Sequence, residues 1–286
     1  MPVPELLAPI GLALVRDAEI MGAEPYFHEL VTGIERVTLP RGRSLLLRVL
    51  PTVEAEVAAY RGWARTGRVG AVVVVDVREG DSRPALVREL GLPAVVVGPP
   101  VGDDVTTVWT DDDEAVRAAV AHLLDRGHRR LLHVGGPADM LHSRVRREGF
   151  EGACRDAGAA GATAVGDYSR ASGAVAVSEA LSRSGRPTAV VVDSDLMALG
   201  ALDAAASAGL RVPEELAVLA WDDSAQCQLS VPPLSAVSRD VQAVGEQVGR
   251  AVLDVLAGAP PRQHHAAPAV VVARESTAAD VTGVVT

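Results

Sequence analysis

Residues 71–97 read AVVVVDVREGDSRPALVRELGLPAVVV. The stretch begins and ends with short, continuous apolar runs at 71–75 and 94–97, and the segment between them has room for a short helix at 84–90. Apolar runs without polar alternation are typical of strands that are covered on both faces of a parallel sheet. The stretch therefore predicts a strand, a helix and a second strand in succession, which is the repeating unit of α/β folds.

The same alternation continues along the chain in two series of similar size. Further strands of this covered kind are expected at 10–15, 45–49, 131–134, 189–192, 216–220 and 267–272. Helices are expected at the apolar stripe of Phe27, Leu30, Val31 and Ile34, at 53–64 after an N-cap at Thr52, from the acids at 111–113 to Gly127, and at 241–256. Residues 257–265 are expected to form a loop, and 279–286 a frayed tail. Two doubly wound parallel-sheet lobes follow, with a ligand in the cleft where the carboxyl ends of both sheets meet.

Composition limits the possible functions. The 286 residues carry 27 basic and 37 acidic side chains, which gives a net charge of −10. An acidic chain does not favour contact with phosphate backbones, so direct DNA binding is not expected. Cys154 and Cys227 are too few for a disulfide framework, which favours a reducing, cytoplasmic setting. The run at 6–15 lacks a preceding basic residue and predicts a strand rather than a signal sequence, and no apolar run is long enough to span a membrane.

Motifs for covalent chemistry are not found in the sequence. It contains no nucleophile elbow, no Walker loop and no zinc-binding His-Glu-x-x-His. The Gly-Gly-Pro segment at 135–137 lacks the remaining features of a dinucleotide site and is interpreted as a turn. The acidic run at 111–114 is interpreted as a helix cap rather than a cation site, and His264 and His265 as a solvated loop pair. We therefore expect no catalytic residue, no cofactor and no bound metal.

Polar residues recur where the predicted strands end. These residues are Arg16, Asp76, Ser194, Asp195, Trp221 and Asp222. Ligands of doubly wound sheets bind at the carboxyl ends of the strands. Arg146 adds guanidinium donors, and Tyr26, Phe27 and Tyr168 add aromatic faces. Acids, arginine and aromatic rings together suit a polyhydroxylated ligand.

A set of ordered motifs resembles the effector-binding core of the LacI/GalR (lactose-repressor/galactose-repressor) transcription regulators. They are HLLDRGHRR at 122–130, GGP at 135–137, RREGF at 146–150, DLMALGAL at 195–202, GLRVPEE at 209–215, WDD at 221–223, PPL at 232–234 and VVAREST at 271–277. Their order and spacing are similar to those of the family over nearly the whole chain. Each motif alone is weak, but the combination is specific.

The resemblance implies a two-lobed fold of the periplasmic-binding-protein-like type I kind, with crossover strands between the lobes. One lobe would comprise 4–108 and 240–266, and the other 109–239 and 267–280. Strand ends and resemblance together give a set of ligand-binding residues: Arg16, Glu24, Tyr26, Phe27, Asp76, Arg146, Tyr168, Ser194, Asp195, Trp221, Asp222 and Arg239. Glu24 and Ser194 stand where the family usually has Asn, and Gly98 where many members have Asp. Such departures change which hydroxyls or charges of an effector can be satisfied.

The resemblance also implies a function. The chain would be the effector-sensing domain of a homodimeric transcription regulator, in which a sugar or sugar-like ligand controls DNA binding allosterically. Only nine residues precede Ile10, so we expect the family's helix-turn-helix to be absent from this chain and operator DNA to be contacted only through it. The alternative is a solute-binding protein that delivers a sugar to a transporter. A third hypothesis is an enzyme that uses Asp76 or Asp222 as acid or base, but no nucleophile and base accompany them.

Overall fold

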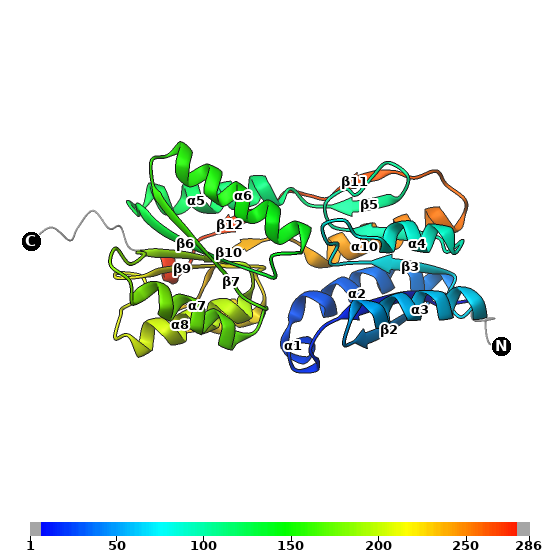
Figure 1. Ribbon diagram of the computed structural model, residues 1–286, viewed down its shortest axis with the longest axis horizontal. Coiled ribbons are helices and arrows are strands. Elements are labelled where there is room, and N and C mark those ends of the chain that lie inside the picture. The colour runs from blue at the N-terminus through cyan, green and yellow to red at the C-terminus, as the bar shows by residue number, and fades with distance from the viewer. Residues whose placement is uncertain (1–6, 279–286) are drawn as a thin grey trace, which may run out of the picture. The chain divides into compact units, whose positions relative to one another are not determined.

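The computed structural model describes residues 7–278, which form two compact units that are each built on a six-stranded sheet (Figure 1). Of these residues, unit 1 contains 7–110 and Asp240–Ala267, and unit 2 contains Asp111–Arg239 and 268–278. The predicted fold class, two doubly wound parallel-sheet lobes, is confirmed. No helix among residues 7–278 is both long and apolar enough to cross a membrane.

Unit 1 has an all-parallel sheet between two layers of helices. The strand order is β11, β5, β4, β3, β1, β2. Its strands are β1 (Ile10–Val15), β2 (Leu45–Leu50), β3 (Ala71–Val74), β4 (Ala94–Val97), β5 (Thr106–Trp109) and β11 (Gln263–His265). Its helices are α1 (Ala18–Ala23), α2 (Pro25–Thr38), α3 (Val53–Thr66), α4 (Arg83–Glu89) and α10 (Val241–Leu256), with the 3-10 turn η1 (Leu39–Arg41). The paired helices α2 and α10 cover one face, and α3 and α4 pack against strands of the same sheet.

The helices α2 and α10 approach each other closely because glycines face each other at their contact. A Cβ atom on Gly33 would lie 2.1 Å from the main-chain oxygen of Gln242, and one on Gly245 would lie 2.4 Å from that of Leu30. Glycine is therefore required at both positions, and it allows the apolar faces of the two helices to bury one continuous core with β1 and β3.

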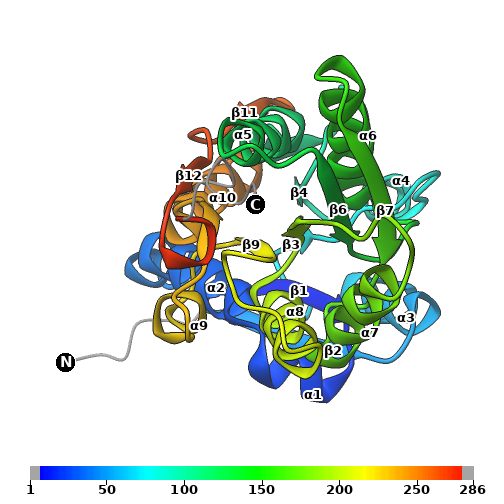
Figure 2. The same ribbon diagram turned by 90° about the vertical axis from the view of Figure 1, so that its left-hand side faces the viewer.

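Unit 2 repeats this layered plan around a mixed sheet, with α5 and α6 on one side of it and α7 and α8 on the other (Figure 2). The strand order is β12, β10, β9, β8, β6, β7, and only the β10–β12 pair is antiparallel. The strands are β6 (Arg130–Gly135), β7 (Ala160–Val165), β8 (Ala189–Val192), β9 (Ala217–Trp221), β10 (Ser235–Ser238) and β12 (Val270–Val272). The helices are α5 (Asp112–Asp125), α6 (Leu141–Asp156), α7 (Arg170–Leu181), α8 (Asp195–Ser207) and α9 (Ala225–Leu229), with the turn η2 (Glu275–Thr277).

The predicted helix caps are confirmed. The Thr52 hydroxyl accepts a hydrogen bond from the Ala55 N–H at 3.2 Å, and the Asp111 carboxylate accepts one from the Glu114 N–H at 3.0 Å. Gly127, with φ of 85°, follows the last turn of α5. These side chains satisfy N–H groups that the first turn of a helix leaves without partners. Cys154 and Cys227 are free and buried.

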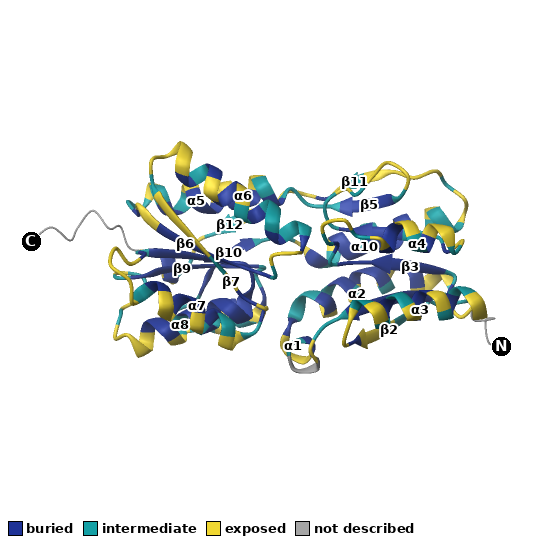
Figure 3. Cartoon of the chain, viewed as in Figure 1, coloured by how far each residue is buried: buried dark blue, intermediate teal, exposed yellow. Residues whose placement is uncertain are grey.

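Several local predictions were wrong, mostly at the edges of the sheets. The strands at 45–49 and 267–272 are not covered on both faces, because β2 and β12 are edge strands. Leu47 and Val49 of β2 are 37% and 40% exposed, and Val270 of β12 is 58% exposed. Figure 3 shows β2 largely in the colour of exposed residues. His264 and His265 lie in β11 rather than in a loop, and the His265 ring stacks on Trp109. The strands β5, β7 and β10 were not predicted. These strands are short or rich in Ala, Gly, Ser and Thr, so they lack a continuous apolar run. The predicted tail at 279–286 lies outside the described residues.

Candidate ligand-binding site

In unit 1, five predicted site residues come together at the carboxyl ends of β1 and β3. Arg16 follows β1, and its Nε lies 3.2 Å from Glu24 Oε2, at the start of α2. Its Nη1 lies 2.7 Å from Asp76 Oδ2, just beyond β3. Phe27 is fully buried, with its ring centroid 5.3 Å from the Arg16 guanidinium carbon, and Tyr26 packs edge-on against it at 5.0 Å. The two carboxylates and the ring therefore hold the guanidinium in one orientation.

Arg146 is the centre of the corresponding cluster in unit 2. This residue of α6 is 3% exposed, and its guanidinium carbon lies 3.9 Å from the ring centroid of Trp221, at the end of β9. Its Nη2 lies 3.2 Å from Asp112 Oδ1, and its Nη1 lies 3.8 Å from Asp193 Oδ2. Burial opposes the charged form of Arg146, but the two carboxylates outweigh it and raise the pKa of the guanidinium.

Asp193 joins this cluster to the middle of the sheet. Its Oδ1 lies 2.8 Å from Nε2 of His133 in β6, and both residues are almost fully buried. The His133 ring stacks on Phe150 with ring centroids 5.3 Å apart. Burial raises the pKa of Asp193, yet the neighbouring His133 and Arg146 lower it below its ordinary value overall. The Asp193 carboxylate is therefore kept ionised beside Arg146.

A second pair of opposite charges lies at the end of β9. Arg239 Nε, just beyond β10, lies 2.7 Å from Asp222 Oδ1. Ser194 caps α8, because its hydroxyl accepts a hydrogen bond from the Met197 N–H at 3.1 Å. Asp195 is 3% exposed, and its carboxylate accepts a hydrogen bond from the Leu196 N–H.

Asp195 has an unusual protonation equilibrium for a carboxylic acid. Burial raises its pKa to about 6; a hydrogen bond from Ser224 opposes the shift, and the negative charge of Asp222 adds to it. The carboxyl ends of β8 and β9 thus place a weakly acidic carboxyl group near a carboxylate that is paired with arginine.

Tyr168 is held across the turn that follows β6. Its hydroxyl lies 2.7 Å from His142 Nε2 and 3.1 Å from the Ser143 hydroxyl, and the residue is 4% exposed. A Cβ atom on Gly136 would lie 2.0 Å from the Tyr168 hydroxyl oxygen. The prediction of a turn at 135–137 holds only in part, because Gly135 is the last residue of β6 and the chain bends at Gly136, which makes room for the tyrosine.

Backbone conformation singles out three of the predicted site residues. Among the described non-glycine residues, only Asp76, Tyr168 and Asp222 have positive φ angles, of 51°, 71° and 61°. Such angles are sparsely populated by L residues and are concentrated at functional sites, where the surrounding structure enforces them. Asp222 directly follows β9, and Asp76 is the second residue after β3, so the turn at each strand end directs the carboxylate to its arginine partner.

The structure adds residues that the sequence analysis missed. His133 and Asp193 were not singled out, and Asp112 was interpreted only as part of a helix cap. Asp193 carried a usable signal, since it directly follows β8, whereas His133 lies inside an apolar strand. Four buried donor or acceptor atoms of the cluster have no hydrogen-bond partner among the described residues: His133 Nδ1, Arg146 Nε, Asp193 Oδ2 and Trp221 Nε1. Buried polar atoms rarely lack a partner, so these atoms favour a ligand-binding role.

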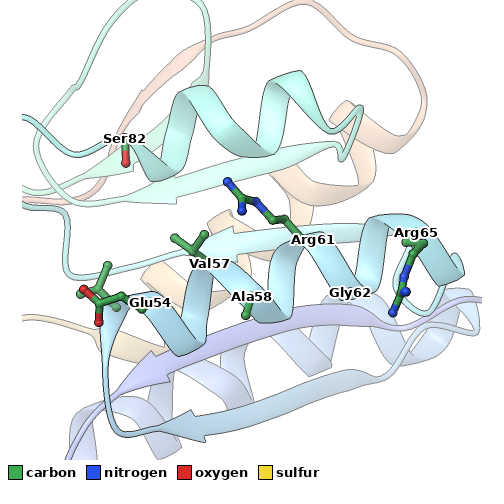
Figure 4. A pocket seen from close by; sticks show the side chains of 8 residues that line it. Glu54, Val57, Ala58, Arg61, Gly62, Arg65 and Ser82 are labelled. Atoms are coloured by element: carbon green, nitrogen blue, oxygen red, sulfur yellow. The ribbon is translucent and has the colours of Figure 1, made fainter.

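A groove that lies away from these clusters runs along α3 of unit 1 (Figure 4). Its volume is about 730 Å³, and its charged side chains Glu54, Arg61 and Arg65 are exposed. A ligand site requires convergent, partly buried polar groups, which this groove lacks and the strand ends provide. Within residues 7–278, no group of three or more His, Cys, Asp or Glu side chains is arranged to hold a metal ion.

Comparison with known proteins identifies the family. A family model described as a periplasmic binding protein-like domain matches residues 120–277. The chain is 30% identical over 257 residues to the HTH-type transcriptional regulator CelR of Thermobifida fusca, covering 87% of this chain and 75% of that protein. The crystal structure of a LacI family transcriptional regulator from Bifidobacterium animalis subsp. lactis matches with a TM-score of 0.87 and 30% identity, covering 95% of this chain and 98% of that one. The chain belongs to the LacI/GalR family of transcription regulators.

A second solved structure supports this membership of the LacI/GalR family. The CelR–cellobiose complex has a TM-score of 0.87 and 28% identity to the chain, covering 94% of this chain and 84% of that one. The resemblance inferred from the sequence motifs is thereby confirmed.

Proposed function

We propose that the chain is an effector-sensing core whose effector is an uncharged sugar or sugar-like molecule. The effector would contact the clusters at the carboxyl ends of the two sheets, with the residue set predicted from the sequence extended by Asp112, His133 and Asp193. The related regulator CelR has been solved in complex with cellobiose, which is an uncharged sugar. The chain's own side chains supply the main argument for the class of ligand.

The observation that carries this proposal is the charge balance of the two clusters. Their three guanidinium groups, of Arg16, Arg146 and Arg239, are paired with five carboxylates: Glu24, Asp76, Asp112, Asp193 and Asp222. A phosphate or carboxylate ligand would have to displace a carboxylate and face the remaining ones, which is repulsive. Sugar hydroxyls both donate and accept hydrogen bonds, so they can bind to paired charges without disturbing them.

In this mechanism no covalent bond changes. The effector would bind one conformation of the chain more tightly than another and so shift their populations by its differential affinity. We propose that the chain works as a homodimer in the cytoplasm and passes this shift to operator DNA through a separate DNA-binding domain. The solute-binding alternative predicts a monomer, so light scattering after size-exclusion chromatography distinguishes the two functions.

A binding panel tests the class of ligand. Thermal-shift measurements and calorimetry would compare cellobiose, ribose and glucose with glucose 6-phosphate and ribose 5-phosphate. A ligand at about 100 times its Kd stabilises the folded state by about 2.7 kcal/mol, which a melting curve resolves. We expect an uncharged sugar to bind and its phosphate ester to bind at least about tenfold more weakly, about 1.4 kcal/mol. Tighter binding of the phosphate ester, or no binding of any sugar in a wider panel, would contradict the proposal.

A further inference from the structure

Unit 1 contains a second buried group of charges, whose side chains do not form ion pairs with Arg16. It consists of Glu56 in α3 and of Asp81 and Arg83 at the start of α4. The exposed fractions of their side chains are 0%, 5% and 3%. Charged residues are rarely buried to this extent unless they are paired, and taking them out of water is costly even when they are. Their position therefore requires an explanation beyond stability.

The guanidinium of Arg83 is saturated, meaning that each of its three nitrogens donates a hydrogen bond to an acceptor in the protein. Its Nη1 donates to both carboxylate oxygens of Glu56, at 2.8 and 2.7 Å. Its Nε donates to Asp81 Oδ1 at 3.0 Å. Asp81 in turn accepts main-chain hydrogen bonds from Arg78 and Arg83, at 3.1 and 2.9 Å. Arg83 thereby joins α3, the loop after β3 and the start of α4.

Arg83 also donates hydrogen bonds to the backbone at Asp76, which is one of the proposed ligand-binding residues. Its Nη2 donates to the main-chain oxygens of Val75 and Asp76, at 3.1 and 2.7 Å. Asp76 has the positive φ of 51°, and its carboxylate contacts Arg16 at 2.7 Å. One guanidinium therefore holds the peptide group of the residue whose side chain orients Arg16. A positive φ at a residue other than glycine persists only where neighbouring contacts enforce it, and Arg83 supplies such contacts.

We propose that Arg83, held by Glu56 and Asp81, is a positioning residue that fixes the backbone of Asp76 and so aims its carboxylate at Arg16 and at the effector. The inference rests on the proposed function, because it treats Asp76 as a ligand-binding residue. Supporting contacts of this kind set how accurately a binding group is placed. In Figure 4, Ser82, which precedes Arg83, lies at the start of α4 above α3.

The test variant is Arg83→Lys, which keeps the positive charge. An ammonium group has three donors and no planar fork, so it cannot bind both carboxylates and both main-chain oxygens together. The matched control is Arg88→Lys, the same change on the same helix at an exposed residue that pairs with Asp104. If Arg83→Lys does not fold, Glu56→Gln keeps the shape of the side chain and removes the charge that orients Arg83.

The first measurement needs no ligand. Hydrogen exchange of the amides at residues 76–82 is followed by mass spectrometry in the wild type and both variants. We expect faster exchange in this segment for Arg83→Lys, with unchanged exchange in unit 2, and no change for Arg88→Lys. Unchanged exchange at 76–82 in Arg83→Lys overturns the proposal whether or not a sugar binds.

The second measurement uses calorimetry with cellobiose, or with the uncharged sugar of the panel that binds most tightly. We expect Arg83→Lys to weaken binding by at least about tenfold, equivalent to about 1.4 kcal/mol, because the Asp76 carboxylate is no longer held in its binding position. In an Asp76→Asn background the same substitution should have little further effect, which a general loss of stability would not produce. Wild-type affinity in Arg83→Lys, or a full additional loss in the Asp76→Asn background, overturns the proposal. If no sugar binds the wild type but exchange at 76–82 rises, the proposed function fails and the positioning of Asp76 stands.

Discussion

Arg83 in unit 1 and Arg146 in unit 2 are equally inaccessible, each 3% exposed, yet their donors are used in different ways. Every nitrogen of the Arg83 guanidinium has an acceptor within 3.0 Å, including two carboxylates. Arg146 has longer contacts, of 3.2 and 3.8 Å, and its Nε has no hydrogen-bond partner within residues 7–278. A saturated arginine supports the structure around it, whereas an arginine with unused donors is available to a ligand. Burial alone would not separate these two roles.

The largest effect is expected from removing the saturated arginine. Arg83→Met leaves Glu56 and Asp81 buried without their cation, and such a change typically costs about 3 to 5 kcal/mol of unfolding free energy. Urea denaturation of the ligand-free chain measures this cost. Tyr60→Phe is the control within the same cluster, since it removes one hydrogen bond to Glu56 and should cost about 1 kcal/mol. A loss below about 1 kcal/mol in Arg83→Met would show that the saturated contacts do not support the fold.

Compared with Arg83→Met, Arg146→Met should reduce the unfolding free energy less and should mainly weaken sugar binding. Asp193 keeps its contact with His133, so the loss of unfolding free energy should be smaller, about 2 kcal/mol. Loss of the donors should weaken binding of the sugar from the panel by about thirtyfold or more, equivalent to about 2 kcal/mol. Denaturation and calorimetry on the same protein give both values. A variant with wild-type affinity and a large loss of stability would place Arg146 in the same class as Arg83.

Asp81, which is paired with Arg83, and Asp195, at the start of α8, differ in their pKa shifts, which gives a prediction on pH. Burial raises the pKa of Asp81, but hydrogen bonds and the charge of Arg83 outweigh it and lower the pKa overall. Burial raises the pKa of Asp195 from 3.8 to about 6. At a pH below the pKa of the unfolded chain, about 3.8, Asp195 is protonated in both the folded and the unfolded state. At a pH between 3.8 and about 6, Asp195 is ionised only in the unfolded state. Its ionisation therefore reduces stability as the pH rises from about 4 to 6.

Asp195→Asn measures this effect directly, because the amide cannot ionise. The unfolding free energy of the wild type, relative to that of the variant, should fall by about 2 kcal/mol between pH 4 and pH 6.5. Denaturant midpoints of both proteins across this range provide the test. A constant difference would mean that Asp195 titrates as an ordinary exposed carboxyl group.

The comparison also shows what the sequence could predict. Arg16, Asp76 and Asp222 were found because the ends of parallel strands are visible as the ends of apolar runs, and ligands bind there. Arg83 was not singled out, because in sequence it is only an arginine near a helix start, and its partner in α3, Glu56, lies 27 residues away. His133 has an apolar neighbour on either side and looks like part of the core. The contacts that give these residues a role depend on which helix covers which face.

Topology explains the errors in the fold in the same way. β2 is apolar except for Arg48 and β4 is apolar throughout, so both were predicted to be covered strands, yet β2 is an edge strand and β4 lies inside the sheet. Position within a sheet depends on the order of the strands, which no local pattern encodes. The predicted units and helix caps, by contrast, depend on local periodicity and local hydrogen bonds.

The smallest effect is expected for an exposed arginine with short contacts. Arg170 lies 2.6 Å from Asp203, closer than any contact of Arg146, but the two side chains are 56% and 47% exposed. Water and salt screen such a pair, so Arg170→Met should change the unfolding free energy by less than about 0.5 kcal/mol and leave sugar binding unchanged. A loss comparable to that of Arg146→Met would mean that distance, rather than burial and donor saturation, determines the effect of an arginine in this protein. The Arg→Met variants at residues 83, 146 and 170 therefore form a series. They test a buried arginine with all donors bonded, a buried arginine with unbonded donors, and an exposed arginine by the same substitution.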